Sequence, residues 1–229
     1  ELHSHRFVVT LTIENPAAAQ QVSLPVWIPG SYLVREFAKN LQCLTAQQDG
    51  KALALQQLDK HRWQVTCRPE VSLELHYEVY ALDTSVRTAW LDSARGFFNG
   101  TSLCLKVEGQ EQLPHTLELV ASKDTAHWHV ATGARAAKVT KNGFGTYRAA
   151  HYDELADCPF EMGTFWSGSF TARGVLHRFV AGALPSFDGA RLLADTQKIC
   201  EAEIQFWHGT QKPPHTEYVF MLNAVDDGY

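Results

Sequence analysis

The segment from Leu24 to Asn40, which reads LPVWIPGSYLVREFAKN, constrains the fold more than any other part of the sequence. Proline presets φ and glycine accepts a positive φ, so Pro29-Gly30 suits the two central positions of a type II turn. The residue before a proline is pushed towards extended geometry, so Ile28 is expected to end a strand. The segment therefore predicts a strand, a fixed turn and a short helix, with Tyr32 and Arg35 tying down a well-packed corner.

Composition excludes several classes of protein. The chain has 229 residues, of which 45% are hydrophobic and 11% aromatic, which is enough to build an ordered core. The net charge of -5 is spread along the chain and there is no basic tract, so we expect no nucleic-acid partner. No apolar run approaches the length of a membrane span, and the N-terminal residues do not resemble a signal peptide, so no membrane association is expected.

The cysteines indicate a reducing compartment. Their number is odd, their spacing is wide and no pair forms a C-x-x-C motif, so a disulfide framework or a zinc knuckle is not expected. Scattered reduced thiols favour a cytoplasmic protein. The cysteines are Cys43, Cys67, Cys104, Cys158 and Cys200.

The first part of the chain has the pattern of half-buried strands. Apolar and polar residues alternate over residues 6–13, 63–67 and 71–79. Asp49-Gly50 and Asn142-Gly143 are strong hairpin turns, because both residues of each pair tolerate positive φ. The sequence therefore predicts a mainly β protein, with an antiparallel β-sandwich or saddle-shaped sheet at its N-terminus.

The pattern changes after Pro185. A helix is predicted from Gly189 to His208, with Ser186 or Asp188 as its N-cap and Gly209 just beyond its end. A short strand is predicted to follow it. We therefore divide the chain into an N-terminal antiparallel β-domain, 1–172, and the start of an α/β domain, 173–229, that contributes a strand, a helix and a strand. The predicted apolar face of the helix comprises Leu192, Leu193, Thr196, Ile199, Cys200 and Phe206.

Few residues have the spacing of a complete catalytic or metal site. His3-x-His5 and His127-x-His129 would each place two imidazoles on one face of a strand, which suits a metal, but neither pair has an obvious third ligand nearby. Ordinary surface or packing histidines are the alternative interpretation. The sequence contains no H-E-x-x-H motif and no G-x-S-x-G nucleophile elbow.

An acidic segment from His151 to Gly163 is more informative. No Lys or Arg occurs between Arg148 and Arg173, so its carboxylates have no counter-charge nearby in the sequence. Such a group would attract a cation, for example the free α-amino group of a peptide. The alternative is a solvated loop with an acidic helical start. The carboxylates are Asp153, Glu154, Asp157 and Glu161.

Several segments together resemble the glycyl aminopeptidase family of zinc metalloproteases, whose members carry a C-terminal PDZ domain. They are WIPGSYLVREFA at 27–38, YALDTSVR at 80–87, GFFNGTS at 96–102, YDELADCPFEMG at 152–163 and the closing DGY at 227–229. The resemblance implies the layout of aminopeptidase N: a β-domain, a thermolysin-like zinc catalytic domain that begins at about residue 173, and a PDZ module. The H-E-x-x-H helix of that family would follow Tyr229, so no catalytic or metal residue is assigned here.

The resemblance also implies which residues face a substrate. Glu161, followed by Met162 and Gly163, is the best match for a carboxylate that binds a peptide's free amine, with Asp157 and Asp153 behind it. The expected partners are a peptide substrate and the protein's own catalytic and PDZ domains. As a fragment the chain is expected to bind no zinc, to be inactive and to self-associate through an exposed apolar face.

Two other functions remain open at this point. One is a free-standing β-sandwich module that binds peptide or carbohydrate, with Trp27 and Tyr32 as stacking surfaces. The other is a structural β-domain that supports a neighbour.

Overall fold

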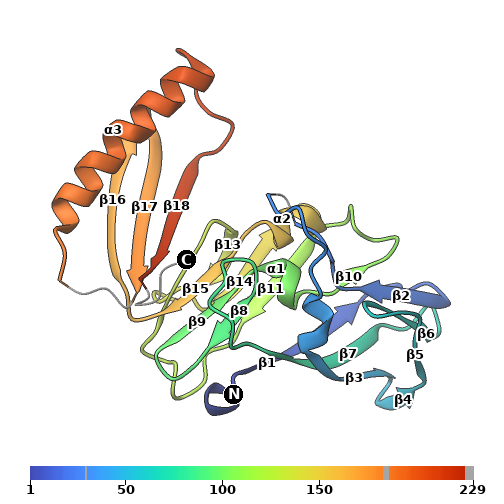
Figure 1. Cartoon of the computed structure of the whole chain (residues 1–229). Coiled ribbons are helices and arrows are strands. Elements are labelled where there is room, and N and C mark those ends of the chain that lie inside the picture. The colour runs from blue at the N-terminus through green and yellow to red at the C-terminus, as the bar shows by residue number, and fades with distance from the viewer. Residues whose placement is uncertain (29, 183–185, 225–229) are drawn as a thin grey trace.

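The chain folds into two units that differ in architecture. A computed structural model describes residues 1–28, 30–182 and 186–224, and Figure 1 shows its course. Residues up to Gly163 form four β-sheets, and the rest form one sheet covered by a long helix. The predictions that rest on Pro29, Pro185 and the closing 227–229 segment lie outside the described residues.

Two four-stranded sheets form one half of the N-terminal unit. Their strand orders are β1-β7-β3-β4 and β10-β2-β6-β5, and every pairing within them is antiparallel. The strands are β1 (Arg6–Ile13), β2 (Ala19–Ser23), β3 (Leu41–Gln48), β4 (Lys51–Leu53), β5 (Leu55–Gln57), β6 (Arg62–Thr66), β7 (Leu73–Tyr80) and β10 (Lys106–Val107). The short 3-10 helices are η1 (Leu2–Ser4) and η2 (Phe37–Asn40).

The other half of this unit contains two further antiparallel sheets. Their orders are β12-β15-β9-β8 and β11-β14-β13. The strands are β8 (Ala89–Leu91), β9 (Arg95–Phe98), β11 (His115–Leu119), β12 (His129–Thr132), β13 (Arg135–Val139), β14 (Gly145–Ala149) and β15 (Phe160–Gly163). Two short helices, α1 (Gly100–Leu103) and α2 (Tyr152–Ala156), lie against each other.

One hydrophobic core joins the sheets of the N-terminal unit. In β7 the residues from Leu73 to Val79 alternate between buried and half-buried, as their apolar and polar character requires. Phe98 of β9 stacks on Phe160 of β15 at 4.9 Å between ring centroids, and it meets Phe7 of β1 edge-on at 5.5 Å. The prediction of a mainly β, antiparallel domain is confirmed.

The two predicted hairpin turns are present. Asp49 and Gly50 both have positive φ, 48° and 71°, as a two-residue turn between β3 and β4 requires. Between β13 and β14, Gly143 has φ 89° and the amide of Thr140 donates to the carbonyl of Phe144 at 2.7 Å. Both turns follow from residues that accept the left-handed region at low energetic cost.

The second unit is a three-stranded sheet with one long helix on it. Its strands are β16 (Trp166–Ala172), β17 (Val175–Gly182) and β18 (Glu217–Asn223), in the order β16-β17-β18. The chain crosses from β17 to the parallel strand β18 through α3 (Gly189–His208), which covers one face of the sheet (Figure 1). This is the predicted strand, helix and strand. The proposed division at residue 172 falls in the turn between β16 and β17, which pair in one sheet.

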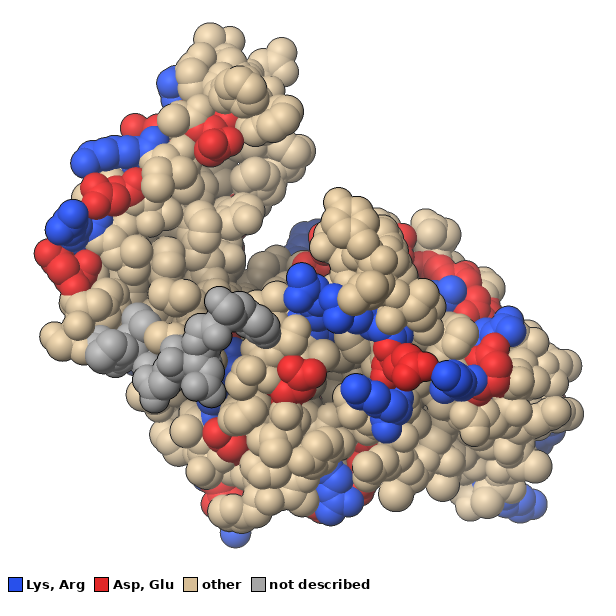
Figure 2. All heavy atoms as spheres, viewed as in Figure 1, with Lys and Arg blue, Asp and Glu red and all other residues tan. Residues whose placement is uncertain are grey.

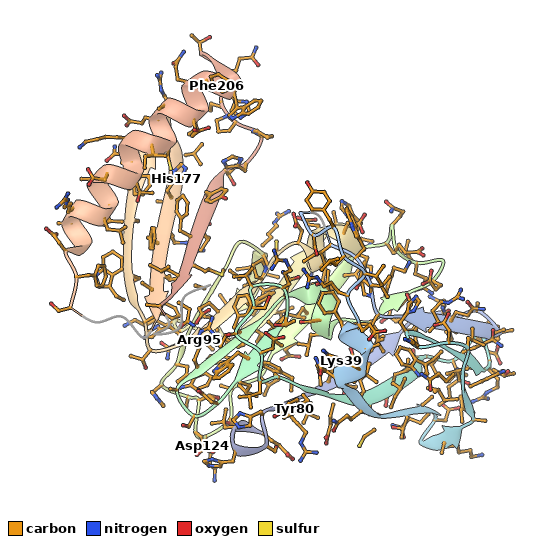
Figure 3. The ribbon with its side chains drawn as sticks, viewed as in Figure 1. Lys39, Tyr80, Arg95, Asp124, His177 and Phe206 are labelled. Atoms are coloured by element: carbon orange, nitrogen blue, oxygen red, sulfur yellow. The ribbon has the colours of Figure 1, made fainter. Side chains whose placement is uncertain are left out.

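The ends of α3 agree with the sequence, but its buried face differs from the predicted one. The carboxylate of Asp188 accepts the amide of Arg191 at 3.0 Å, and Gly209 ends the helix with φ 60°. Four of the six predicted face residues are half-buried, but Ile199 and Phe206 are exposed. Ile204, which was not predicted, is buried. Figure 3 labels Phe206 near the end of α3. Leu193 packs on Gly168 of β16. At 3.6 residues per turn, Ile204 lies on the same side of the helix as Leu193, whereas Ile199 and Phe206 point away from it.

The predicted well-packed corner is wrong in its main feature. Tyr32 is 99% exposed, and helical structure starts only at Phe37. Part of the prediction holds: Arg35 Nε donates to Ser31 Oγ at 2.9 Å, and Gly30 has φ 78°. Ile28, Ser31 and Phe37 are the buried anchors, and Tyr32, Leu33 and Val34 between them are exposed.

Within the described residues, no helix combines the length and the apolar character needed to span a bilayer.

We expect the contact between α1 and α2 to be sensitive to one methyl group. A Cβ on Gly100 would lie 2.7 Å from Ala156 Cα and 2.9 Å from the carbonyl oxygen of Leu155, so backbone would have to move. Gly100→Ala should lower the free energy of unfolding by about 1–3 kcal/mol, measured by urea denaturation. Gly133→Ala is the control, because a Cβ there has no atom within 4 Å. Equal stability of the two variants would contradict this close packing.

Candidate functional site

Three of the segments that carry the family resemblance meet around one cavity. The loop that contains Trp27, the start of α1 and the whole of α2 line a space of about 1080 Å³. These segments are far apart in the sequence, and the sheets of the N-terminal unit bring them together. The lining from these segments comprises Trp27, Ile28, Asn99, Thr101, His151, Tyr152, Asp153, Glu154, Ala156 and Asp157.

Helix α2 and its C-cap present three carboxylates to this cavity: Asp153, Asp157 and Glu154, whose side chain accepts the amide of Ala150. Asp153 lies in the first turn of α2 and Asp157 is its C-cap, four residues later, so both are on one side of the helix. Both side chains are exposed, and neither belongs to any of the ion pairs found within the described residues. They therefore form a negative wall without a fixed counter-charge.

Two contacts fix the position of α2: a hydrogen bond from the buried Tyr152 and a cap at the start of the helix. Tyr152 is buried and its hydroxyl donates to the carbonyl of Cys104 at 2.7 Å. Burial raises the pKa of Tyr152 well above its ordinary value, so this hydroxyl remains a donor. His151 caps the helix, because its Nδ1 accepts the amide of Glu154. The carboxylates on α2 are thus held by a rigid anchor.

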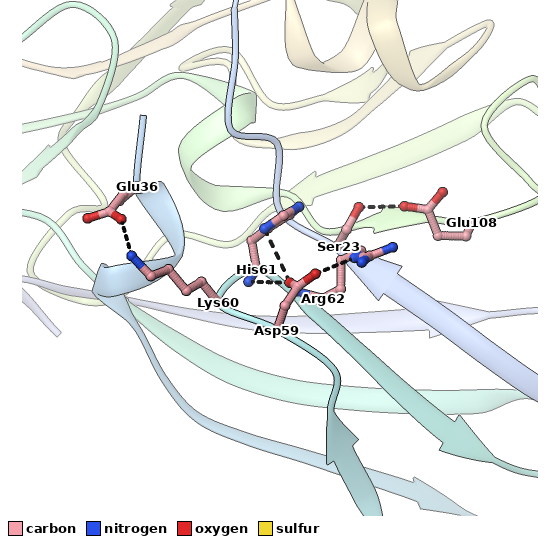
Figure 4. Close-up of polar contacts among 7 residues, drawn as sticks. All are labelled: Ser23, Glu36, Asp59, Lys60, His61, Arg62 and Glu108. Carbon is pink, nitrogen blue, oxygen red and sulfur yellow. Dashed lines mark hydrogen bonds and ion pairs between the residues drawn. The ribbon is translucent and has the colours of Figure 1, made fainter. Parts of the chain in front are cut away.

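Ser23, His61, Arg62 and Glu108 also line the cavity, and their polar side chains are paired, as Figure 4 shows. The hydroxyl of Ser23 donates to Glu108 at 2.6 Å. Asp59 accepts the amide of His61 at 3.0 Å and Arg62 Nε at 2.6 Å. The bond from the His61 backbone is the main reason why the pKa of Asp59 lies below its ordinary value. These groups are neutralised internally, in contrast to α2.

Glu161, the first candidate from the sequence for binding a substrate amine, lies in β15 and outside this cavity. It is 4% exposed, and its two oxygens accept Nε and Nη2 of Arg95, each at 2.7 Å. Burial raises the pKa of Glu161, and the bonds and charge of Arg95 oppose that shift. Arg95 itself lies over the ring of Phe97, 5.2 Å from its centroid.

The sequence-based view that the acidic segment has no counter-charge is therefore wrong for Glu161. Its partner stands 66 residues earlier in the chain, on the neighbouring strand β9. Arg95 is the partner of this candidate site residue that sequence reasoning missed. The only signal available was its place next to the Gly96–Ser102 motif, at the start of a strand.

Met162 and Gly163, the other predicted site residues, are buried in the same strand. Met162 is a core residue, and its Cε lies 3.0 Å from the position of a Cβ on Gly96. Gly163 has φ 146°, and a Cβ there would lie 2.9 Å from the carbonyl oxygen of Ala94. The structure thus places Glu161, Met162 and Gly163 in β15, and Asp153 and Asp157 around the cavity. Their roles in substrate binding stay predictions.

Glu161 lies where the two units of the chain meet. Its Oε1 is 3.8 Å from the position of a Cβ on Gly182, at the end of β17, and the side-chain oxygen of Asn223, at the end of β18, is 3.9 Å from the same point. Figure 3 shows Arg95 near the base of the second unit. The carboxyl ends of two parallel strands thus converge on the buried ion pair.

A second cavity, of about 1150 Å³, separates the two units on the side of β12, β13 and β16. Figure 2 shows the hollow between them. Arg178 spans it, since its Nη2 donates to the carbonyl of Thr132 at 2.9 Å and its Nε pairs with Glu217. The second unit is therefore held to the N-terminal unit by polar bonds.

The histidine pairs do not form recognisable metal sites. His5 Nδ1 lies 2.6 Å from the carbonyl oxygen of Leu91, and His129 packs edge-on against Phe165. His127 is exposed in the turn before β12. In the described part of the chain, no three side chains among His, Cys, Asp and Glu come together in a way that could hold a metal ion. The five cysteines are free thiols.

Comparison with known families identifies the N-terminal unit. Residues 1–164 match the family described as the peptidase M61 N-terminal domain. The chain belongs to this family. The match ends within the connection between β15 and β16, so the M61 N-terminal domain coincides with the four sheets of the first unit.

A solved structure extends this relationship over the second unit. An aminopeptidase N family protein from Idiomarina loihiensis is 42% identical, covers 100% of this chain and superimposes with a TM-score of 0.95. The chain spans 38% of that protein's length. A comparison with curated protein sequences finds no match.

More distant structures share the fold. An M1 zinc metallopeptidase from Deinococcus radiodurans has a TM-score of 0.51 at 14% identity, and covers 97% of this chain and 53% of its own. Aminopeptidase A from Legionella pneumophila, solved with aspartic acid, has a TM-score of 0.53 at 8% identity, with 96% and 27% covered. The arrangement of a multi-sheet β unit followed by β16 to β18 is thus shared with aminopeptidases of little sequence similarity.

The ion pair between Arg95 and Glu161 should be essential to the stability of the M61 N-terminal domain. Arg95→Met leaves a buried carboxylate without its partner, so we expect a loss of about 3–5 kcal/mol in the free energy of unfolding. Arg95→Met with Glu161→Gln should recover most of that loss, because no buried charge remains. Urea denaturation of the single and double variants measures both effects.

The stability of Arg95→Met should also depend on pH in a defined direction. Burial then acts unopposed on Glu161 and raises its folded pKa above the ordinary 4.5. A carboxyl with a raised folded pKa favours folding at low pH, and this contribution is lost as pH rises from 4.5 through the folded value. Arg95→Met should therefore approach the double variant below pH 4.5. A constant difference between them across pH would contradict this assignment.

Proposed function

We propose that this chain is the N-terminal region of a zinc-dependent aminopeptidase that removes N-terminal residues from peptides. In this role the M61 N-terminal domain caps the substrate cleft. The observation that carries the proposal is the agreement over the whole chain, at 42% identity, with an aminopeptidase N family protein. Support comes from the convergence of three motif-bearing segments on one cavity.

Within this proposal, carboxylates of the N-terminal unit bind the substrate's free amine. Glu161 comes first, because it lies at the carboxyl ends of β17 and β18, where α/β sheets commonly bind ligands. Each of its oxygens accepts one bond from Arg95 and retains a lone pair for an ammonium donor. Asp153 and Asp157, which have no cationic partner in the described chain, come second, because they line a separate cavity that does not include Glu161.

We place the zinc ligands outside this chain. The described residues offer no suitable donor set, and the sequence has no H-E-x-x-H. The units β17, α3 and β18 would then be the first elements of a thermolysin-like catalytic domain. The chain alone is proposed to be inactive, and the full-length protein to be a cytoplasmic glycyl aminopeptidase with a PDZ module.

The full-length protein tests this function directly. It should release the first residue from peptides with a free N-terminus, lose this activity with a chelator and regain it with zinc. N-acetylated peptides are the matched control and should not be cleaved. Activity that survives complete removal of zinc, or equal cleavage of acetylated peptides, would refute the proposal.

The role of Glu161 can be tested separately in the full-length enzyme. A charge-assisted bond to an ammonium is worth about 1.5–3 kcal/mol, so Glu161→Gln should raise KM for free peptides about tenfold or more. The exposed Glu118 of β11 offers the control Glu118→Gln, with unchanged KM. Thermal unfolding of both variants shows whether the fold is intact. Unchanged KM and kcat in folded Glu161→Gln would exclude this role.

A second function, a free-standing module that binds peptide or carbohydrate, has one observation in its favour. Trp27 at the rim of the cavity is 57% exposed, which suits stacking on a ligand. The reading frame after Tyr229 distinguishes the two proposals. An H-E-x-x-H motif within a few tens of residues supports the aminopeptidase.

A further inference from the structure

The loop between β2 and η2 exposes an unusual amount of apolar surface. We call residues 26–28 and 30–36 the docking loop. Tyr32 is almost fully in solvent, and Leu33 and Val34 are 63% and 74% exposed. Trp27, at the start of the loop, is more than half exposed. Single exposed apolar residues are ordinary on protein surfaces, but a contiguous group marks an interaction site.

Hydrogen bonds join the described residues of the docking loop to one another. The amide of Arg35 donates to the carbonyl of Val26 at 2.6 Å, which closes the loop at its base. The amide of Ser31 donates to the carbonyl of Ile28 at 3.2 Å. The guanidinium of Arg35 donates a hydrogen bond to the hydroxyl oxygen of Ser31. The buried residues Leu24, Ile28 and Phe37 fix both ends in the core. Tyr32, Leu33 and Val34 are therefore presented outwards between residues that are hydrogen-bonded or buried.

The docking loop borders the candidate site. Trp27 and Ile28 line the same cavity as Asp153 and Asp157. A surface that covers Tyr32, Leu33 and Val34 would therefore lie beside that cavity and narrow its access to water. Exclusion of water strengthens the attraction between a carboxylate and a substrate amine.

We propose that the docking loop is the surface on which the remainder of the same polypeptide packs, with an apolar face against Tyr32, Leu33 and Val34. This inference rests on the proposed function, because it requires a catalytic domain beyond this chain. In the homologue from Idiomarina loihiensis the matching region is 38% of the protein, so a large remainder is available as the occupant.

A linked domain fits this surface better than a second copy of the chain does. Stable association between separate proteins needs about 800 Å² of buried surface on each partner. The apolar surface described here is confined to one loop. A covalently linked domain is present at high effective concentration and can use a smaller contact.

Chemical modification of Tyr32 tests the proposal. Tetranitromethane should nitrate Tyr32 readily in this chain and at least tenfold more slowly in the native full-length protein, as measured by peptide mass spectrometry. Tyr80, which is 39% exposed and lies on β7 of the N-terminal unit, serves as the internal reference (Figure 3). Unfolding the full-length protein in urea should restore the reactivity of Tyr32.

Matched variants give an independent measurement. Val34→Ser should leave the midpoint of urea unfolding of this chain unchanged. In the full-length protein, the same substitution should make a protease cut at least tenfold faster in the connection between this chain and the remainder. Val120→Ser is the control, because Val120 is 81% exposed and lies outside the docking loop. Equal effects of the two variants would count against the proposal.

The outcomes separate this inference from the proposed function. Equal nitration of Tyr32 in this chain and in an active full-length enzyme overturns the docking surface alone. Protection of Tyr32 in a full-length protein without zinc-dependent peptidase activity supports the docking surface and refutes the proposed function. In a third outcome, Tyr32 of this chain becomes protected as the protein concentration and the mass of the particle in solution rise together. That result assigns the loop to contact with a second copy and also overturns the proposal.

Discussion

The buried ion pair between Arg95 and Glu161 is the interaction on which the arrangement of this protein depends. It joins β9 to β15, the two central strands of their sheet, at the point where the second unit approaches. Removing two charges from water is unfavourable, so such a pair persists only with good geometry. Two parallel hydrogen bonds supply that geometry, and the ring of Phe97 supports the guanidinium.

The charged groups of the N-terminal unit divide into neutralised and open sets. Glu108 is bonded at the cavity, Asp59 is bonded to the cavity residue Arg62, and Glu161 is bonded within its sheet. Asp153, Glu154 and Asp157 face the same cavity without a cation in the described chain. Pairing fixes the position of a carboxylate, whereas the unpaired carboxylates at the cavity have no fixed cation to displace. This division, together with the family membership, supports a substrate-facing role for α2.

Much of the secondary structure could be predicted because it depends on local physics. Alternation over 71–79 predicts β7, and the Asp49-Gly50 turn follows from the φ angles those residues tolerate. The site was less predictable. Asp153 and Asp157 line the cavity, yet nothing in their own segment indicates that Trp27 lies across from them. Arg95 was missed because pairing between strands, not sequence distance, selects the partner of Glu161.

The sequence by itself determined the strands, the turns, the caps of α3 and, through its motifs, the family. These features depend on backbone preferences and side-chain spacing over a few residues. Only the tertiary structure decided that Trp27, Tyr32, Leu33 and Val34 face outwards and that Glu161 is paired. An apolar side chain has the same hydrophobicity whether it enters the core or a docking surface. Which of these surfaces it meets is set by contacts between segments far apart in the chain.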